Sequence, residues 1–420
     1  MSSSTDAALP SVHLHVSHAF GGGIDRWVRD FALADPHNTH LYLQSTGMPE
    51  SYGLGLRLVE LPAERELGRW ELAQPITEVR DRHPEYLGIV QRLCDAHGVD
   101  QIIVSSLAGH ALELFRLGVP VTQVHHDFFP HCPAWFVYRR GICRTCTHED
   151  LATCHSSNPH HKPWGSADYH MALRDAYFEA VHAAGALHVS PSAGLPQKLR
   201  QLDHRWDAID FAVIEHGLGY HKRNLFGGAE EGRRLRVGVL GQLSWHKGRH
   251  QLIQLFERTR GFLDFYFLGA DDHTLGERFG MTYVERYTRQ ELPDLLERFR
   301  LDLMLFLPIV PESFSYTLSE SWCFCIPPMI RPVGAFGERV AEGHDGFFVS
   351  PHDDSVVDLL LEVDQKRDLL RAMAGRLSRK PVWSRESAAG DYYRLWNTHQ
   401  QWNANKEWNA SSHPPQGVCA

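Results

Sequence analysis

The chain has 420 residues, of which 43% are hydrophobic, so it is long enough for two domains with sizeable cores. Its net charge of −9 argues against a protein that binds nucleic acid over a broad surface. The N-terminal residues lack the features of a secretory signal, and no apolar run approaches the roughly 18 residues that span a bilayer. We therefore expect a cytoplasmic protein, in solution or in peripheral contact with the inner face of the cell membrane.

Short apolar segments alternate with segments of helical period, which is typical of an α/β protein with mainly parallel sheets. In the first half, strands are expected over residues 12–16, 40–44, 101–105, 119–125 and 187–190. The expected helices cover residues 24–34, 85–97, 110–117 and 166–184. This alternation predicts a first Rossmann-like domain over residues 1–216.

Two turns of the first half follow predicted strands, where parallel sheets bind their ligands. One is a glycine-rich turn in which Gly22 and Gly23 would let the backbone approach a ligand closely. The alternative is an ordinary turn, and the dinucleotide-binding spacing G-x-G-x-x-G is not present. The other is His125-His126-Asp127, in which His126 could hold a ligand hydroxyl with Asp127 orienting its ring.

Residues 128–165 form an insertion with cysteines spaced C-x10-C-x2-C-x7-C. The pair Cys143 and Cys146 has the spacing of half a tetrahedral thiolate site, and a bound metal would hold a long loop of low apolar content. We therefore expect a structural zinc ion without a catalytic role, because four thiolates leave no open coordination position. The expected ligands are Cys132, Cys143, Cys146 and Cys154. The alternatives are free thiols in a flexible loop, or His148 or His155 in place of one cysteine.

A polar, glycine-rich stretch over residues 217–232 is the expected linker to a second Rossmann-like domain over residues 233–383. Strands are expected there over residues 235–241, 264–268, 281–284, 301–307, 328–331 and 347–349. A C-terminal helix is expected over residues 384–404, and residues 405–420 are expected to form a loose tail.

The most informative segment of the second half is Pro311-Glu-Ser-Phe-Ser-Tyr-Thr-Leu-Ser-Glu, between a predicted strand and a predicted helix. Free backbone amides at the positive end of the helix dipole would bind an anion. These amides belong to Ser313, Phe314, Ser315 and Tyr316. Glu312 and Glu320, seven residues apart, would accept hydroxyl hydrogen bonds on either side, as a sugar nucleotide requires. The alternative is an ordinary helix capped by Ser315, with Glu320 in solvent.

Two other turns of the second half could contribute to the same site. Lys247 lies at the mouth of a predicted helix, where its ammonium group can neutralise a diphosphate. The alternative is a surface lysine on a helix cap. Gly269 ends a predicted strand, and a glycine there permits a close approach of the backbone to a ligand. This strand end and turn resemble those that line a nucleotide-base pocket.

The spacing of Glu312 and Glu320 resembles the E-x7-E motif of retaining GT-B glycosyltransferases, especially family 4. The resemblance covers about residues 235–351, and His126 matches the family's His-Asp motif in the first half. It implies two facing Rossmann-like domains, the first for the acceptor and the second for the nucleotide sugar, with the C-terminal helix crossing back. The chain departs from the family at Gln242, where an arginine is common, so Lys247 would carry most of the charge on the diphosphate.

The resemblance implies transfer of a hexosyl or deoxyhexosyl group from a nucleotide-sugar donor to a glycan or lipid-linked glycan, with retention, in bacterial surface polysaccharide synthesis. Glu312, His126 and Lys247 would be catalytic, and no catalytic metal is expected. Glu320 would hold the ribose. The remaining donor contacts would come from Gly22, Gly23, Gly269 and the four amides. The alternatives are a nucleotide-sugar epimerase of the same fold and a non-catalytic assembly module.

Overall fold

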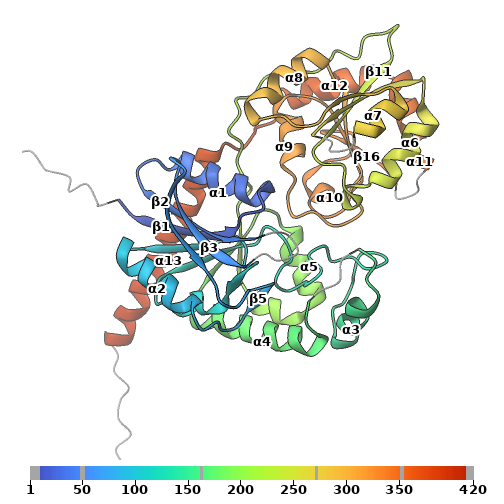
Figure 1. The fold of residues 1–420 in the computed structure, drawn as a ribbon. Coiled ribbons are helices and arrows are strands. Elements are labelled where there is room, and N and C mark those ends of the chain that lie inside the picture. Colours follow the sequence, from blue (N-terminus) through green and yellow to red (C-terminus); the bar gives the residue numbers. More distant parts are fainter. Residues whose placement is uncertain (1–9, 48–52, 161–163, 270–272, 351–353, 413–420) are drawn as a thin grey trace, which may run out of the picture.

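The computed structural model describes residues 10–47, 53–160, 164–269, 273–350 and 354–412. The chain forms two α/β halves, each built around its own sheet (Figure 1). The parallel pairing that dominates both sheets confirms the fold class expected from the sequence. Within the described residues, no helix is both long and apolar enough to cross a bilayer.

The sheet of the first half has the strand order β10-β9-β8-β6-β1-β2-β3-β4. Its strands are β1 (Val12–His18), β2 (Thr39–Thr46), β3 (Gly55–Leu61), β4 (Arg65–Glu71), β6 (Gln101–Val104), β8 (Val121–Val124), β9 (Leu187–Ser190) and β10 (Phe211–Val213). A separate pair joins β5 (Val79–Arg80) to β7 (His110–Ala111). β3 and β4 are antiparallel additions that the sequence did not predict, because β4 is an edge strand with mostly polar residues.

The helices of the first half are α1 (Gly22–Ala34), α2 (Tyr86–His97), α3 (His148–Ser157), α4 (Ala167–Ala183) and α5 (Gly194–Leu202). Two 3-10 helices are η1 (Leu112–Arg116) and η2 (His204–Ala208). The helix expected over residues 110–117 is wrong, because this stretch is divided between β7 and η1. Gly109 and Gly118, both with positive φ, close the stretch at its two ends and leave no room for a longer helix.

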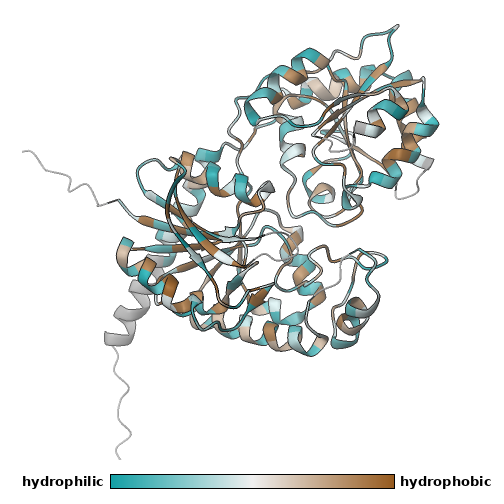
Figure 2. Cartoon of the chain, viewed as in Figure 1, coloured by the Kyte–Doolittle hydropathy of each residue, from teal (hydrophilic) through white to brown (hydrophobic). Residues whose placement is uncertain are grey.

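The sheet of the second half is parallel throughout, with the order β13-β12-β11-β14-β15-β16. Its strands are β11 (Leu235–Leu240), β12 (Leu263–Leu268), β13 (Thr282–Val284), β14 (Leu303–Phe306), β15 (Pro328–Ile330) and β16 (Phe347–Phe348). Its helices are α6 (Arg249–Thr259), α7 (His273–Phe279), α8 (Leu292–Phe299), α9 (Tyr316–Cys323), α10 (Ala335–Arg339), α11 (Asp354–Gln365) and α12 (Asp368–Leu377), with 3-10 helices η3 (Trp245–Lys247) and η4 (Arg289–Glu291). Hydrophobic residues follow the strands of both sheets, whereas the helices carry many hydrophilic ones (Figure 2).

The last helix, α13 (Arg385–Ser412), returns from the second half to pack beside α1 (Figure 1). Tyr392 and Trp396 are buried in one core cluster with Trp27 and Phe31, and Trp396 Nε1 donates to Thr122 Oγ1 at 2.9 Å. The helix continues to Ser412, so the predicted loose tail is wrong for residues 405–412, and residues 413–420 lie outside the described part.

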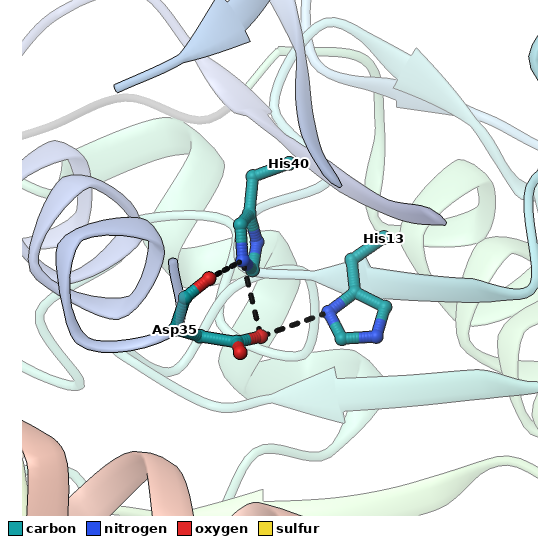
Figure 3. Close-up of side chains that lie close together, drawn as sticks. All are labelled: His13, Asp35 and His40. Atoms are coloured by element: carbon teal, nitrogen blue, oxygen red, sulfur yellow. Dashed lines mark hydrogen bonds and ion pairs between the residues drawn. The ribbon is translucent and has the colours of Figure 1, made fainter. Parts of the chain in front are cut away.

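A histidine-rich polar cluster supports this packing at the amino ends of β1 and β2, where His13, Asp35 and His40 converge (Figure 3). Asp35 Oδ2 lies 3.1 Å from His40 Nε2 and 3.8 Å from His13 Nδ1, and the carboxylate also accepts hydrogen bonds from Tyr393 and Asn38. Burial raises the pKa of Asp35, but hydrogen bonds from His40, Tyr393 and Asn38 outweigh it and hold the pKa at about 2. The charged carboxylate therefore ties Tyr393 of α13 to the first half.

Candidate active site

A cavity of about 490 Å³ lies between the two halves, at the carboxyl ends of β1, β8 and β14. Both halves contribute to its wall, as parallel sheets do when a ligand binds between two domains. Nine of the predicted catalytic and donor-binding residues line it. They are Gly22, Gly23, His126, Lys247, Glu312, Ser313, Phe314, Ser315 and Tyr316. Gly269 and Glu320 do not line this cavity.

The loop between β14 and α9 is fixed in place by a tight contact with the segment before α10. Glu312 and Gly334 form an isolated β-bridge, and Ala335 N donates to Glu312 O at 2.8 Å. Gly334 has a φ of 60°, and a Cβ atom there would lie 2.6 Å from both the backbone N and O of Glu312. A side chain at Gly334 would therefore displace the loop that carries Glu312.

The same loop presents unpaired backbone amides at the start of α9. Ser315 is the N-cap, as one reading of the sequence proposed, and its Oγ accepts from Leu318 N at 3.3 Å. Within the described part of the chain, the amides of residues 313–317 donate no hydrogen bond. The guanidinium of Arg339 contacts the carbonyls of Phe314 and Ser315 at 3.0 and 3.2 Å, which fixes these peptide groups. The amides are thus available to an anion.

Lys247 and Glu312 place opposite charges on the wall of this cavity. Lys247 ends η3, and its Nζ lies beside Gly241, where an added Cβ would be only 3.2 Å away. Enclosure in the cavity raises the pKa of the Glu312 carboxyl, and the charge of Lys247 opposes this shift. A ligand with both a negatively charged group and hydroxyl groups would find a partner for each.

His126 is paired with a second histidine that the sequence did not indicate. His126 Nδ1 lies 3.1 Å from His216 Nε2, and burial lowers the pKa of His126 to about 3, so the ring is neutral at physiological pH. Among the described residues His126 Nε2 is buried without a hydrogen-bond partner, in a residue that lines the cavity. Asp127 does not orient His126 as expected, because its carboxylate accepts instead from Phe129 N at 2.8 Å.

Glu320 is engaged by a residue of the first half. Glu320 is 3% exposed, and its carboxylate oxygen Oε1 lies 2.7 Å from Arg26 Nη1. Arg26 comes from α1, stacks over the ring of Tyr316 at 4.1 Å, and itself lines the cavity. The reading in which Glu320 is solvated is therefore wrong, and the carboxylate instead forms a largely buried ion pair between the halves.

Comparison with solved structures defines the fold. HepE of Anabaena, solved with UDP and glucose, has a TM-score of 0.59 at 13% identity, with 92% of this chain and 99% of HepE aligned. A glycosyltransferase of Rickettsia africae has a TM-score of 0.61 at 13% identity, with 93% of this chain and 98% of that protein aligned. Sucrose-phosphate synthase of Thermosynechococcus elongatus has a TM-score of 0.59 at 12% identity, with 94% of this chain and 100% of the synthase aligned. The chain has the GT-B fold. No protein-family model matches the sequence, and no curated protein sequence matches it either.

The GT-B fold explains why the cavity lies where two sheets face each other, and it confirms the architecture expected from the E-x7-E resemblance. Three residues of this site were not found from the sequence. Arg26 could have been suspected, because it lies one turn after Gly22 and Gly23 in the same helix. His216 and Arg339 carry no local signal, since each reaches the site only through packing between distant segments.

Gly269 lies close to Gly241, in the turn that leads to Lys247. A Cβ at Gly269, whose φ is 90°, would lie 3.3 Å from both Gly241 Cα and Tyr287 Cε1. The glycine therefore lets β12 end close to the turn that precedes Lys247. Residues 270–272, which continue the predicted base-binding turn, lie outside the described residues.

The structure brings the four predicted zinc ligands to a second cavity, of about 310 Å³, within the insertion of the first half. These residues are Cys132, Cys143, Cys146 and Cys154. All four cysteines line this cavity, but no three of their sulfur atoms lie within 4.8 Å of one another. Among the described residues, only the ligand atoms of His13, Asp35 and His40 form a group of three that all lie within 4.8 Å. Residues 161–163 of the predicted insertion lie outside the described part.

Proposed function

We propose that the protein is a glycosyltransferase that moves a sugar from a nucleotide-sugar donor to a glycan or lipid-linked glycan with retention of configuration. The unpaired amides of residues 313–317 carry the proposal, because they share one cavity with Lys247 and Glu312. Together these groups match a diphosphate attached to a sugar. The structural similarity to HepE, whose complex holds UDP and glucose, supports the same donor class.

In the proposed reaction, the amides and Lys247 stabilise the negative charge of the departing nucleoside diphosphate. This role does not depend on a metal ion. Glu312 and the neutral ring of His126 hold hydroxyl groups of the transferred sugar and fix the anomeric carbon toward the acceptor. Gly22 and Gly23 line the same cavity from the first half, where the acceptor would enter.

Arg26 gives this site a second cation. The position where family-4 enzymes often carry an arginine is Gln242 in this chain, and Arg26 lines the same cavity from the opposite half. We infer that Arg26 contributes to binding the diphosphate. Arg26 contacts Oε1 of Glu320, so a ribose hydroxyl would bind at Oε2 or share Oε1 with the guanidinium.

A negative charge introduced beside the amides of residues 313–317 tests the anion site directly. Thr317→Asp places a carboxylate in the first turn of α9, beside the cavity, where it favours the helix but repels a diphosphate. We expect the wild type to be stabilised by one of UDP, GDP or dTDP in a thermal-shift screen. We expect Thr317→Asp to bind that nucleotide at least about tenfold more weakly, which is about 1.4 kcal/mol, with an unchanged melting temperature.

Ser387→Asp is the matched control, since it adds the same charge to the first turn of α13 at an exposed position. A wild type that binds none of the nucleotides, or a Thr317→Asp variant with wild-type affinity, would contradict the proposal. Incubation with the matching nucleotide sugar then separates the enzyme classes. Release of an epimerised sugar without acceptor would identify an epimerase, whereas slow release of nucleotide with the original sugar is expected of a transferase.

A further inference from the structure

We propose that the four cysteines of the insertion bind one zinc ion, and that this ion holds the wall of the active-site cavity against the turn that carries Lys247. The ligands are Cys132, Cys143, Cys146 and Cys154. Zinc–sulfur bonds of about 2.3 Å place the sulfurs of a tetrahedral site about 3.8 Å apart. The ion would therefore draw the four side chains inward across their shared cavity.

The surroundings of the sulfurs fit a negatively charged metal centre. A zinc ion with four thiolates has a net charge of −2, and such centres are stabilised by N–H groups that point at sulfur. The buried guanidinium of Arg174 donates to Cys146 Sγ at 2.9 Å and also to the backbone carbonyl of Cys146 at 2.9 Å. Asn158 Nδ2 donates to Cys154 Sγ at 3.2 Å, and Arg139 lines the same cavity.

The segment that bears the cysteines has little other support. Residues 127–147 contain no helix and no strand apart from an isolated bridge between Tyr138 and Ile142. Trp135 and Val137 have positive φ values of 68° and 51°, a conformation that is strained for residues with a side chain. A cross-link by metal would hold this backbone in place, because it fastens the loop to α3 through Cys154.

The same segment separates the thiol cavity from the active-site cavity. Trp135 and Phe136 line the active-site cavity, whereas Val137 and Tyr138 line the thiol cavity. The ring of Phe136 lies 5.0 Å from that of His246, the residue before Lys247. His160, at the far end of the insertion, stacks on Trp245 with ring centroids 4.0 Å apart. Loss of the metal would therefore loosen two contacts with the turn that carries Lys247.

Metal analysis of the full chain, purified without a histidine tag, tests the site. We expect about one zinc per chain by elemental analysis and less than about a tenth of that in Cys143→Ser/Cys146→Ser. Cys94→Ser/Cys323→Ser, which alters two buried cysteines outside the insertion, should keep its zinc. Titration of the wild type with a mercurial, with released zinc detected by a chromogenic chelator, gives a measurement that does not depend on the folding of a variant.

Hydrogen–deuterium exchange tests the link to the active site. Metal removal is expected to increase exchange over residues 128–160 and also over residues 243–249, while β12 stays unchanged. Wild-type protein with little zinc and freely reactive thiols would overturn the metal site, as would iron with inorganic sulfide. Unchanged exchange over residues 243–249 would overturn the link to Lys247. These measurements are independent of whether the protein transfers a sugar.

Discussion

Replacing Lys247 with methionine is expected to weaken binding of the preferred nucleoside diphosphate about 30- to 100-fold, or about 2 to 3 kcal/mol. Lys247 contributes a positive charge to the cavity that also holds the free amides of α9. Methionine keeps much of the aliphatic side chain, so packing around η3 should be preserved. The corresponding nucleoside, which has no phosphate, should bind equally to both proteins in calorimetry. Lys366→Met, at an exposed position, is the matched control.

A double substitution tests whether the charges of Lys247 and Glu312 act on the same ligand. Without Lys247, the Glu312 carboxylate is left in the cavity to repel the diphosphate, so Lys247→Met/Glu312→Gln should regain part of the lost affinity. Such recovery requires the two side chains to act on the same ligand. Strictly additive losses in the two single variants, or diphosphate affinity unchanged in Lys247→Met, would contradict the site that we propose.

Acid is expected to destabilise this protein at unusually mild pH, because many of its histidines are buried and neutral. Burial is the largest cause that lowers the pKa of eleven histidines in the folded chain. They are His13, His15, His18, His110, His125, His126, His131, His170, His188, His216 and His246. The unfolded chain binds protons at these groups below about pH 6.5. The folded chain binds them at seven of the groups only at about pH 4 or lower. At the other four the pKa also lies well below its ordinary value.

This difference in bound protons fixes the direction of the effect. The folding stability decreases as the pH is lowered wherever the unfolded chain binds more protons than the folded chain. Each such histidine costs about 1.4 kcal/mol per pH unit below about 6.5. The carboxyls of Glu78 and Asp127, whose pKa values burial raises to about 7, act in the opposite direction and offset about two of these protons. Several histidines together still exceed the folding free energy of a typical domain within one or two pH units.

Urea unfolding measured between about pH 7.5 and about pH 5.5 tests this expectation, and the midpoint should fall by more than half. Unfolding near pH 5.5 should take up at least about four protons, measured by the pH change in weakly buffered solution. His188→Gln should reduce this uptake by about one proton, with the same substitution at exposed His204 as the control. A midpoint that does not change over this range would refute the expected role of the histidines.

The central part of the site could be predicted from the sequence because it depends on neighbours along the chain. β14, the loop after it and α9 form one continuous segment, so the positions of Glu312 and the amides followed from local pattern alone. Lys247 was found for the same reason, as a cation in a turn between β11 and α6. The GT-B fold likewise followed from the repeated alternation of strands and helices.

The remaining features depend on contacts between distant segments. The Arg26–Glu320 pair joins residues 294 positions apart, and the His126–His216 pair joins residues 90 apart. Neither residue in such a pair indicates its partner, so Glu320 was expected to be free for the ribose and Asp127 to orient His126. The number of histidines was visible in the sequence, but the burial of many of them was not.

The position of α13 has a consequence for how the chain is made. Trp27 and Phe31 of α1 lie in a core that is completed by Tyr392 and Trp396, nearly 400 residues into the chain. During translation the first half therefore leaves the ribosome with an apolar face uncovered. That face stays exposed until α13 has been synthesised, near the end of the polypeptide. A fragment cut within residues 217–232 would keep this face exposed and tend to aggregate. Fusing residues 384–412 to such a fragment would supply the missing cover.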